Sequence, residues 1–71
     1  MMNNLNEAKN QLAMCRNKDQ LYSTLDAICS DAGFYYHLTM GFSYNIQRAR
    51  SQERFKVVEL IQCAERLGMR L

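Results

Sequence analysis

The sequence predicts an all-α fold, a small bundle of three or four helices in which residues 1–71 form a single domain. The chain contains no proline and three glycines in 71 residues, so it has few of the residues that favour tight β-turns. Apolar side chains recur at spacings of three and four over most of its length. Two Asn-x-x-Glu/Gln sequences also have the form of helix N-terminal capping boxes.

The first two helices are predicted from their caps. Asn4 stands three residues before Glu7, and Asn17 stands three residues before Gln20. Each asparagine can therefore accept a hydrogen bond from the backbone N–H that opens a helix. Gly33 stands where a residue in the left-handed conformation would end the second helix. The apolar stripes behind the caps are Leu5, Ala8, Leu12 and Cys15 in the first helix, and Leu21, Leu25, Ile28 and Ala32 in the second.

The aromatic segment 34–44 supports two interpretations. Its aromatic residues favour a strand, whereas the spacing of Tyr35, Leu38 and Phe42 places these residues on one face of a helix. A lone strand has no partner within the chain and could pair only across a dimer. We therefore predict a helix, with a short strand in 34–42 as the alternative. Phe34, Leu38 and Phe42 are expected to fill the core.

From Ser43 the sequence predicts one long helix to the C-terminus. Phe55 falls on the opposite side of this helix from the apolar stripe, near Arg48 and Arg66. An apolar ring in that position needs a second neighbour or a partner protein. The stripe itself consists of Ile46, Ala49, Val57, Leu60, Ala64, Leu67 and Leu71, with the polar pair Arg50 and Glu53 inside it.

The sequence offers little support for catalysis, a cofactor or a metal site. No two of Cys15, Cys29, His37 and Cys63 have the spacing of a zinc site, and no phosphate loop, glycine fingerprint or serine-centred elbow is present. We therefore expect a non-enzymatic protein without cofactor or metal. Three widely spaced cysteines, no signal-peptide pattern and no apolar run of bilayer length predict a cytoplasmic protein that does not enter a membrane.

An alternative function is DNA binding. Residues 28–34 are similar to the middle of a helix-turn-helix and to the Ile-Ala-x-x-x-Gly-Phe run of AraC-type regulators. The corresponding recognition helix would begin at Tyr35, contain Gly41 and carry no arginine or lysine before Arg48. Six of the nine basic residues lie in the last third of the chain, but acidic residues interleave with them and the net charge is only +2. A small helix-turn-helix-like DNA-binding protein is therefore the alternative reading.

A longer resemblance covers residues 12–42. Leu21, Leu25 and Ile28 on a helix, followed by Gly33-Phe34-Tyr35-Tyr36, resemble the opening of LuxR-type autoinducer-binding domains. The later strands and helices that supply the ligand pocket in that family are missing here, so an autoinducer pocket is not implied. The resemblance implies a fragment or mimic that engages a transcription regulator of this type.

The clustering of aromatic residues predicts a protein-binding module. Five of the seven aromatic residues fall between Phe34 and Tyr44, and tyrosine and arginine are favoured at interface hot spots. We predict a small regulatory protein that binds another protein, for example a transcription regulator, and that forms a homodimer, since association would help so short a chain to bury its apolar faces. The predicted contact residues are Tyr35, Tyr36, Tyr44, Phe55, Arg48 and Arg66.

Overall fold

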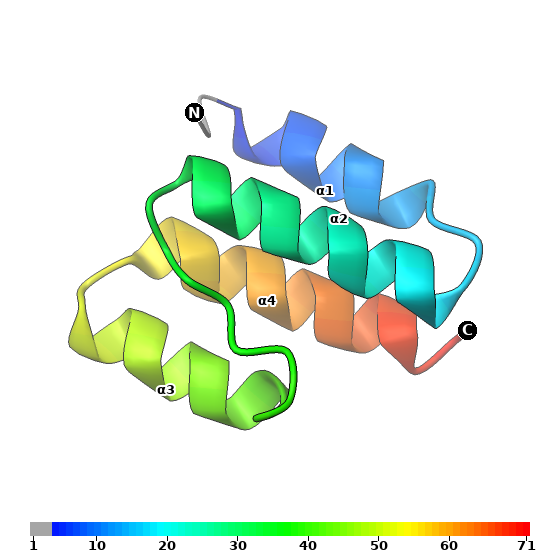
Figure 1. Ribbon diagram of the computed structural model, residues 1–71. Coiled ribbons are helices and arrows are strands. Elements are labelled where there is room, and N and C mark those ends of the chain that lie inside the picture. The colour runs from blue at the N-terminus through cyan, green and yellow to red at the C-terminus, as the bar shows by residue number, and fades with distance from the viewer. Residues whose placement is uncertain (1–3) are drawn as a thin grey trace.

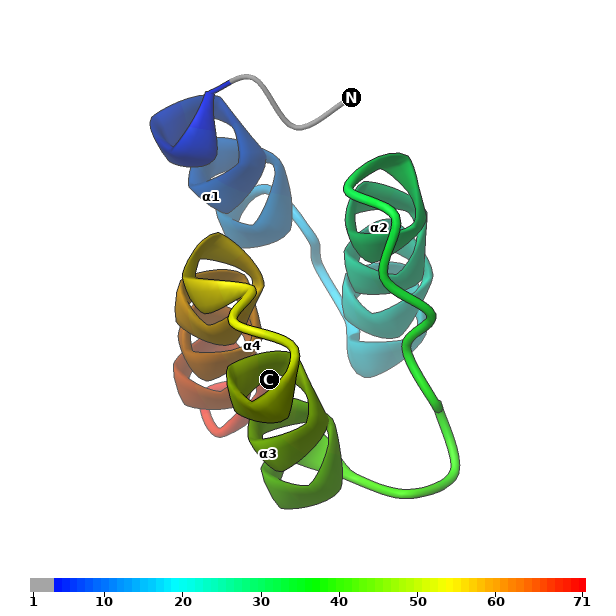
Figure 2. The same cartoon turned by 90° about the vertical axis from the view of Figure 1, so that its left-hand side faces the viewer.

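The computed structural model describes residues 4–71, which form four helices and no strand: α1 (Leu5–Ala13), α2 (Lys18–Asp31), α3 (Phe42–Ser51) and α4 (Phe55–Gly68). The prediction of a small all-α bundle is confirmed. Helix α4 lies in the middle and packs against each of the other three helices, and α1 also packs against α2 (Figures 1 and 2). Within residues 4–71 no helix is both long and apolar enough to cross a membrane.

Both predicted N-caps are confirmed. The Asn4 Oδ1 atom accepts a hydrogen bond from the backbone N–H of Glu7 at 3.1 Å, and Asn17 Oδ1 accepts one from the N–H of Gln20 at 2.8 Å. The Gln20 side chain in turn accepts a hydrogen bond from the backbone N–H of Arg16 at 2.9 Å. Side chains thus satisfy N–H groups that have no partner inside the helix.

The apolar faces of the helices meet in one core. Its largest fully buried members are Leu12 from α1, Leu21 and Leu25 from α2, and Val57, Leu60 and Ile61 from α4, together with Phe34 from outside the helices. The accessible surface of the chain is 4736 Å². A monomeric folded protein of this mass is expected to expose about 4600 Å². The four helices therefore bury a core of ordinary size within one chain.

The prediction of one long helix over 43–71 is wrong, because a turn at residues 52–54 separates α3 from α4. Glu53 adopts a left-handed conformation with φ of 57°. The N–H of Arg54 donates to the carbonyl of Ala49 at 2.8 Å, and the N–H of Glu53 donates to that of Arg50 at 3.0 Å. These two bonds form a Schellman motif that ends α3. The polar pair Arg50 and Glu53 inside the apolar stripe marks this turn in the sequence.

The same motif ends α2, this time with the expected glycine. Gly33 has a φ of 78°, and its N–H donates to the carbonyl of Ser30 at 2.9 Å. The N–H of Phe34 donates to the carbonyl of Cys29 at 2.8 Å. The prediction that α2 ends at Gly33 is confirmed.

The segment 34–41 is neither helix nor strand, so both the predicted helix and its strand alternative are wrong. It connects the end of α2 to the start of α3 (Figure 2), two helices that meet through the Tyr22 and Phe42 rings, whose centroids are 5.8 Å apart. Phe34 and Tyr36 are buried in the core, as predicted for Phe34, and Phe42 is partly buried against the core. Leu38, which was expected in the core, is instead 55% exposed. The segment thus connects the two helices and contributes two buried side chains to the core.

Candidate protein-binding surface

The end of the 34–41 segment is fixed by Asn45, a fully buried polar side chain in the first turns of α3. Its Oδ1 accepts a hydrogen bond from the backbone N–H of His37 at 2.8 Å. Its Nδ2 donates to the carbonyl oxygens of His37 at 2.9 Å and Gly41 at 2.7 Å. A buried amide with its acceptor and donors paired holds the backbone in one conformation, because breaking any of these bonds leaves a buried polar group without a partner.

The start of the segment is fixed by two arginines. Arg48 Nη1 donates to the carbonyl oxygen of Tyr35 at 2.9 Å. Arg54 Nη1 donates to the carbonyl oxygen of Ala32 at 2.7 Å, which also caps the C-terminus of α2. Side chains from α3 and from the turn before α4 therefore hold the backbone at both ends of the segment.

The Arg48 side chain also packs against aromatic rings. Its guanidinium lies over the Phe34 ring, 4.7 Å from the ring centroid, and beside the Tyr44 ring at 5.8 Å. Such cation–π contacts are favourable by about 0.5–2 kcal/mol, depending on how far the charge is desolvated. Arg48 therefore links the inward-facing Phe34 to the outward-facing Tyr44.

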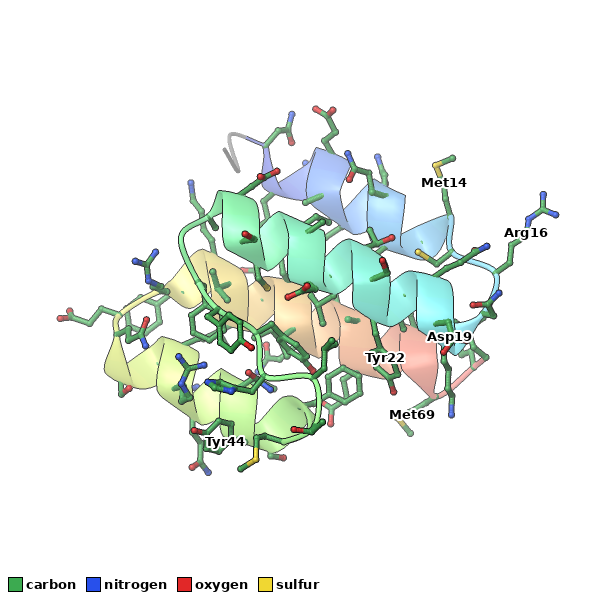
Figure 3. The ribbon with its side chains drawn as sticks, viewed as in Figure 1. Met14, Arg16, Asp19, Tyr22, Tyr44 and Met69 are labelled. Atoms are coloured by element: carbon green, nitrogen blue, oxygen red, sulfur yellow. The ribbon has the colours of Figure 1, made fainter. Side chains whose placement is uncertain are left out.

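This fixed backbone displays a group of large apolar side chains. Tyr35, Leu38, Met40 and Tyr44 are 69%, 55%, 53% and 39% exposed. The His37 ring stands edge-on to the Tyr35 ring at 4.6 Å and to the Tyr44 ring at 5.6 Å, so the three rings form one cluster. Tyr44 lies far from Met14 and Arg16, which mark the α1–α2 connection at the other end of the bundle (Figure 3). We call the five residues Tyr35, His37, Leu38, Met40 and Tyr44 the loop surface.

The six predicted contact residues are not all brought together. Tyr35, Tyr44 and Arg48 lie in one cluster, as the contacts above show. Tyr36 is only 3% exposed, so its assignment as a contact residue is corrected: it belongs to the core. Desolvation by burial, followed by the nearby Cys29, Tyr22 and Glu65 groups, raises the pKa of Tyr36 to about 12.

Phe55 and Arg66 lie on α4, outside the loop surface. Phe55 is 63% exposed at the first residue of α4, beside a shallow groove lined by Ala32, Glu53, Arg54, Lys56 and Val57. Arg66 is exposed in the last turns of the same helix, about 16 Å further along its axis. The prediction that Phe55 and Arg48 share a helix face is wrong, because the turn at 52–54 puts them on different helices.

Sequence reasoning missed Asn45, Arg54 and Met40. Asn45 left a signal, since it is a polar residue next to Ile46 in the core stripe and four residues after Gly41. The sequence gives no signal for the role of Arg54, because that role depends on the carboxyl end of α2 lying next to the start of α4. Met40 is exposed on an irregular segment. Its exposure was not expected, because a helix was predicted for this segment.

The remaining reactive groups do not form a second site. Burial, and to a lesser extent the Asp26 carboxylate, raises the pKa of the Cys29 thiol to about 12, so this thiol is protonated at neutral pH. Cys15 and Cys63 are unpaired and partly exposed, and the Cys15 thiol contacts Thr24 Oγ1 at 3.4 Å. Within residues 4–71 no three His, Cys, Asp or Glu side chains are grouped to hold a metal ion.

The helix-turn-helix expected for DNA binding is not formed at the predicted place. The recognition helix would begin at Tyr35, but the backbone is irregular from there to Gly41 and the next helix begins at Phe42. An irregular segment held against the bundle cannot enter a major groove as a helix does. Residues 28–41 therefore do not form the helix-turn-helix on which the DNA-binding alternative was based.

The fold and the loop surface define a small four-helix protein that displays an aromatic loop in a fixed conformation. Comparison of the chain with protein-family models, with curated proteins and with solved structures gives no match. The resemblance of residues 12–42 to LuxR-type autoinducer-binding domains stays a prediction. Function is argued below from the residues of the chain itself.

Proposed function

We propose that this chain is a non-enzymatic regulatory protein that acts by binding another protein through the loop surface. The observation that carries the proposal is the exposure of Tyr35, Leu38, Met40 and Tyr44 on a backbone held by buried or stacked polar side chains. Of the eight large apolar side chains that are exposed in residues 4–71, these four lie within the ten positions 35–44. An apolar cluster of this kind on a small protein is typical of an interaction site.

The fixed backbone favours binding energetically. A flexible loop loses conformational entropy when a partner orders it, at about 0.5–1.5 kcal/mol for each immobilised side chain and more for the backbone. Here Asn45 and Arg48 have already ordered the backbone of the segment. Tyrosine also presents a large contact area with few rotatable bonds, which is why it is common at hot spots.

The identity of the partner is proposed from the sequence alone. The resemblance of residues 12–42 to LuxR-type domains favours a transcription regulator of this type. The unpaired cysteines Cys15, Cys29 and Cys63 fit a reducing compartment, so we propose the cytoplasm as the place of action. A homodimer is a further proposal, which sedimentation equilibrium over a range of concentrations would test.

Site-specific photo-crosslinking tests the proposed function. Benzoylphenylalanine is placed at Tyr35 or, as a matched control, at Met14, which is exposed at the opposite end of the bundle. In cells of the source organism we expect one dominant crosslinked protein from position 35 that is absent from position 14 and is lost when Tyr44→Ala is added. Identical crosslinks from both positions, or none from position 35, would overturn the proposal. Salt-sensitive retention of duplex DNA by the chain would instead favour the DNA-binding alternative.

A further inference from the structure

The formal charges of the segment that carries the loop surface are of one sign. No Asp or Glu occurs between Asp31 and Glu53, so all seven acidic residues lie outside 32–52. Seven of the nine basic residues also lie outside this segment, so the formal net charge of +2 is that of Arg48 and Arg50. The loop surface itself therefore carries no carboxylate, and the Arg48 guanidinium contacts it at the Tyr35 carbonyl and the Tyr44 ring.

The Arg48 charge is positioned but not neutralised. Among the residues that the structure describes, the one ion pair joins Lys9 and Glu59 at 2.8 Å, so no carboxylate lies within ion-pair distance of Arg48. Its bond to the Tyr35 carbonyl and its contacts with Phe34 and Tyr44 fix the plane of the guanidinium. No buried side-chain nitrogen in this part of the chain lacks a partner, so the guanidinium nitrogens of Arg48 that form no hydrogen bond here are not fully buried.

We propose that the loop surface binds an acidic segment of the partner protein, one in which an Asp or Glu stands beside aliphatic or aromatic residues. This inference rests on the proposed function and names the chemistry of the partner. The partner's carboxylate pairs with the free edge of the Arg48 guanidinium, a geometry that arginine supports with two parallel hydrogen bonds. The adjoining apolar side chains of the partner pack on Leu38, Met40 and Tyr44 and exclude water from the ion pair.

A second copy of the chain fits this surface less well than an acidic partner. In a twofold dimer the same patch meets itself, so Arg48 of each chain would face a patch without a carboxylate to receive it. The two like charges would also lie close to each other across the axis. Charge complementarity therefore selects a different protein as the occupant of this surface.

Single-stranded nucleic acid and anionic membranes also fit less well. Bases stack on free ring faces, but the Arg48 guanidinium lies over one face of the Tyr44 ring, 5.8 Å from its centroid. Leu38 and Met40 add aliphatic surface, which suits a protein. Membrane-binding basic patches contain about four to eight Lys or Arg residues, whereas the segment 32–52 carries two, Arg48 and Arg50.

The test compares three variants that differ in charge. Leu38→Glu and Leu38→Lys remove the same exposed apolar group and leave Asn45, Arg48 and their hydrogen bonds in place, while Met14→Glu adds a negative charge at the opposite end of the bundle. A displayed library of random peptides is selected on the wild-type protein, and the selected peptides are titrated against all variants. We expect Asp or Glu next to apolar residues in the selected peptides. We also expect binding at least about tenfold weaker for Leu38→Glu than for Leu38→Lys, and unchanged for Met14→Glu.

The outcomes separate the inference from the proposed function. Equal weakening by Leu38→Glu and Leu38→Lys, or selection of neutral or basic peptides, would overturn the acidic partner but keep protein binding through the loop surface. Selection of no peptide above the background, or peptides that bind all three variants as tightly as the wild type, would overturn both. Phosphatidylserine vesicles and oligothymidylate are tested in parallel, and tighter binding of either than of the peptides would also reject the acidic protein segment.

Discussion

The side-chain amide of Asn45 pairs with both backbone groups of His37, accepting from its N–H at 2.8 Å and donating to its carbonyl oxygen at 2.9 Å. This pairing has the form that a neighbouring strand would provide in a β-ladder. It explains how an aromatic, strand-favouring segment stays irregular when residues 4–71 contain no strand to pair with it. The buried Asn45 amide supplies the hydrogen bonds that a neighbouring strand would otherwise make to His37.

We predict that Asn45→Ala lowers the free energy of unfolding by about 1–3 kcal/mol, because it removes three hydrogen bonds and leaves the His37 N–H without its partner. The carbonyl oxygens of His37 and Gly41 keep the backbone N–H groups of Met40 and Asn45 as donors. Urea denaturation measures this loss, and hydrogen exchange should quicken at the His37 amide. Asn10→Ala serves as control, since Asn10 is exposed on α1 and a surface change of this kind costs less than about 0.5 kcal/mol. A loss of similar size in both variants would contradict the role assigned to Asn45.

Glu53 occupies a backbone conformation that suits glycine. Its φ of 57° costs a non-glycine residue about 1–2 kcal/mol. We predict that Glu53→Gly stabilises the protein by about 0.5–1 kcal/mol, since the relief of strain exceeds the added entropy of the unfolded chain. Thermal unfolding followed by circular dichroism measures the shift.

The opposite change at the equivalent position of α2 is its control. Gly33→Ala should destabilise the protein by about 1 kcal/mol, because Gly33 has a φ of 78°. A Cβ atom there would lie no closer than 3.6 Å to the Arg54 guanidinium, so backbone strain and not a clash causes the loss. Stabilisation by Gly33→Ala, or destabilisation by Glu53→Gly, would show that the two turns are not held in the conformations described.

Stability should fall as the pH rises from about 9 to 12. Burial raises the pKa of the Cys29 thiol from 9.0 to about 12, and that of the Tyr36 hydroxyl from 10.0 to about 12. In this window the unfolded chain releases the two protons while the folded chain keeps them, so rising pH favours unfolding. Below pH 9 both groups are protonated in both states and contribute no slope.

The measurement is urea denaturation under reducing conditions at several pH values between 8 and 11. Each buried group should contribute a slope of about 1 kcal/mol per pH unit within its window. The double variant Cys29→Ala, Tyr36→Phe lacks both protons and should therefore show a flatter pH dependence than the wild type. Parallel curves for the two proteins would mean that neither group keeps its proton in the folded state.

The sequence predicted those parts of the fold that local chemistry determines. Asn4, Asn17 and Gly33 act on backbone groups within a few residues of their own positions. Their residue types alone therefore predicted both ends of α2 and the start of α1. The turn after α3 uses the same hydrogen bonds as the turn after α2, but with Glu53 in place of a glycine. Its sign in the sequence was the polar pair Arg50 and Glu53 inside the apolar stripe, and not a residue that favours turns.

The loop surface depended on contacts between distant residues. The conformation of 34–41 is set by Asn45, Arg48 and Arg54, which lie up to 22 positions from the carbonyl groups they hold. Periodicity within the segment therefore could not predict it. The aromatic clustering did locate the surface, while the choice between Tyr35 and Tyr36 required knowledge of which ring faces the core.

Tyr35 and Tyr36 should respond in opposite ways to truncation. Tyr36→Ala removes a ring that is buried in the core, so we expect a loss of about 3–5 kcal/mol in the free energy of unfolding. Tyr35→Ala removes an exposed ring that contacts the perpendicular His37 ring. The free energy of unfolding should therefore fall by less than about 1 kcal/mol.

Partner binding should show the reverse order. The Tyr35→Ala variant stays folded and should lose most of its binding to the crosslinked partner, since a hot-spot tyrosine contributes about 2 kcal/mol or more to an interface. The milder Tyr36→Phe variant keeps the buried ring and should bind that partner as the wild type does. Calorimetric titration of both variants measures this difference. If Tyr35→Ala bound normally while Tyr36→Phe did not, the buried side of the segment and not its exposed side would be the one that the partner senses.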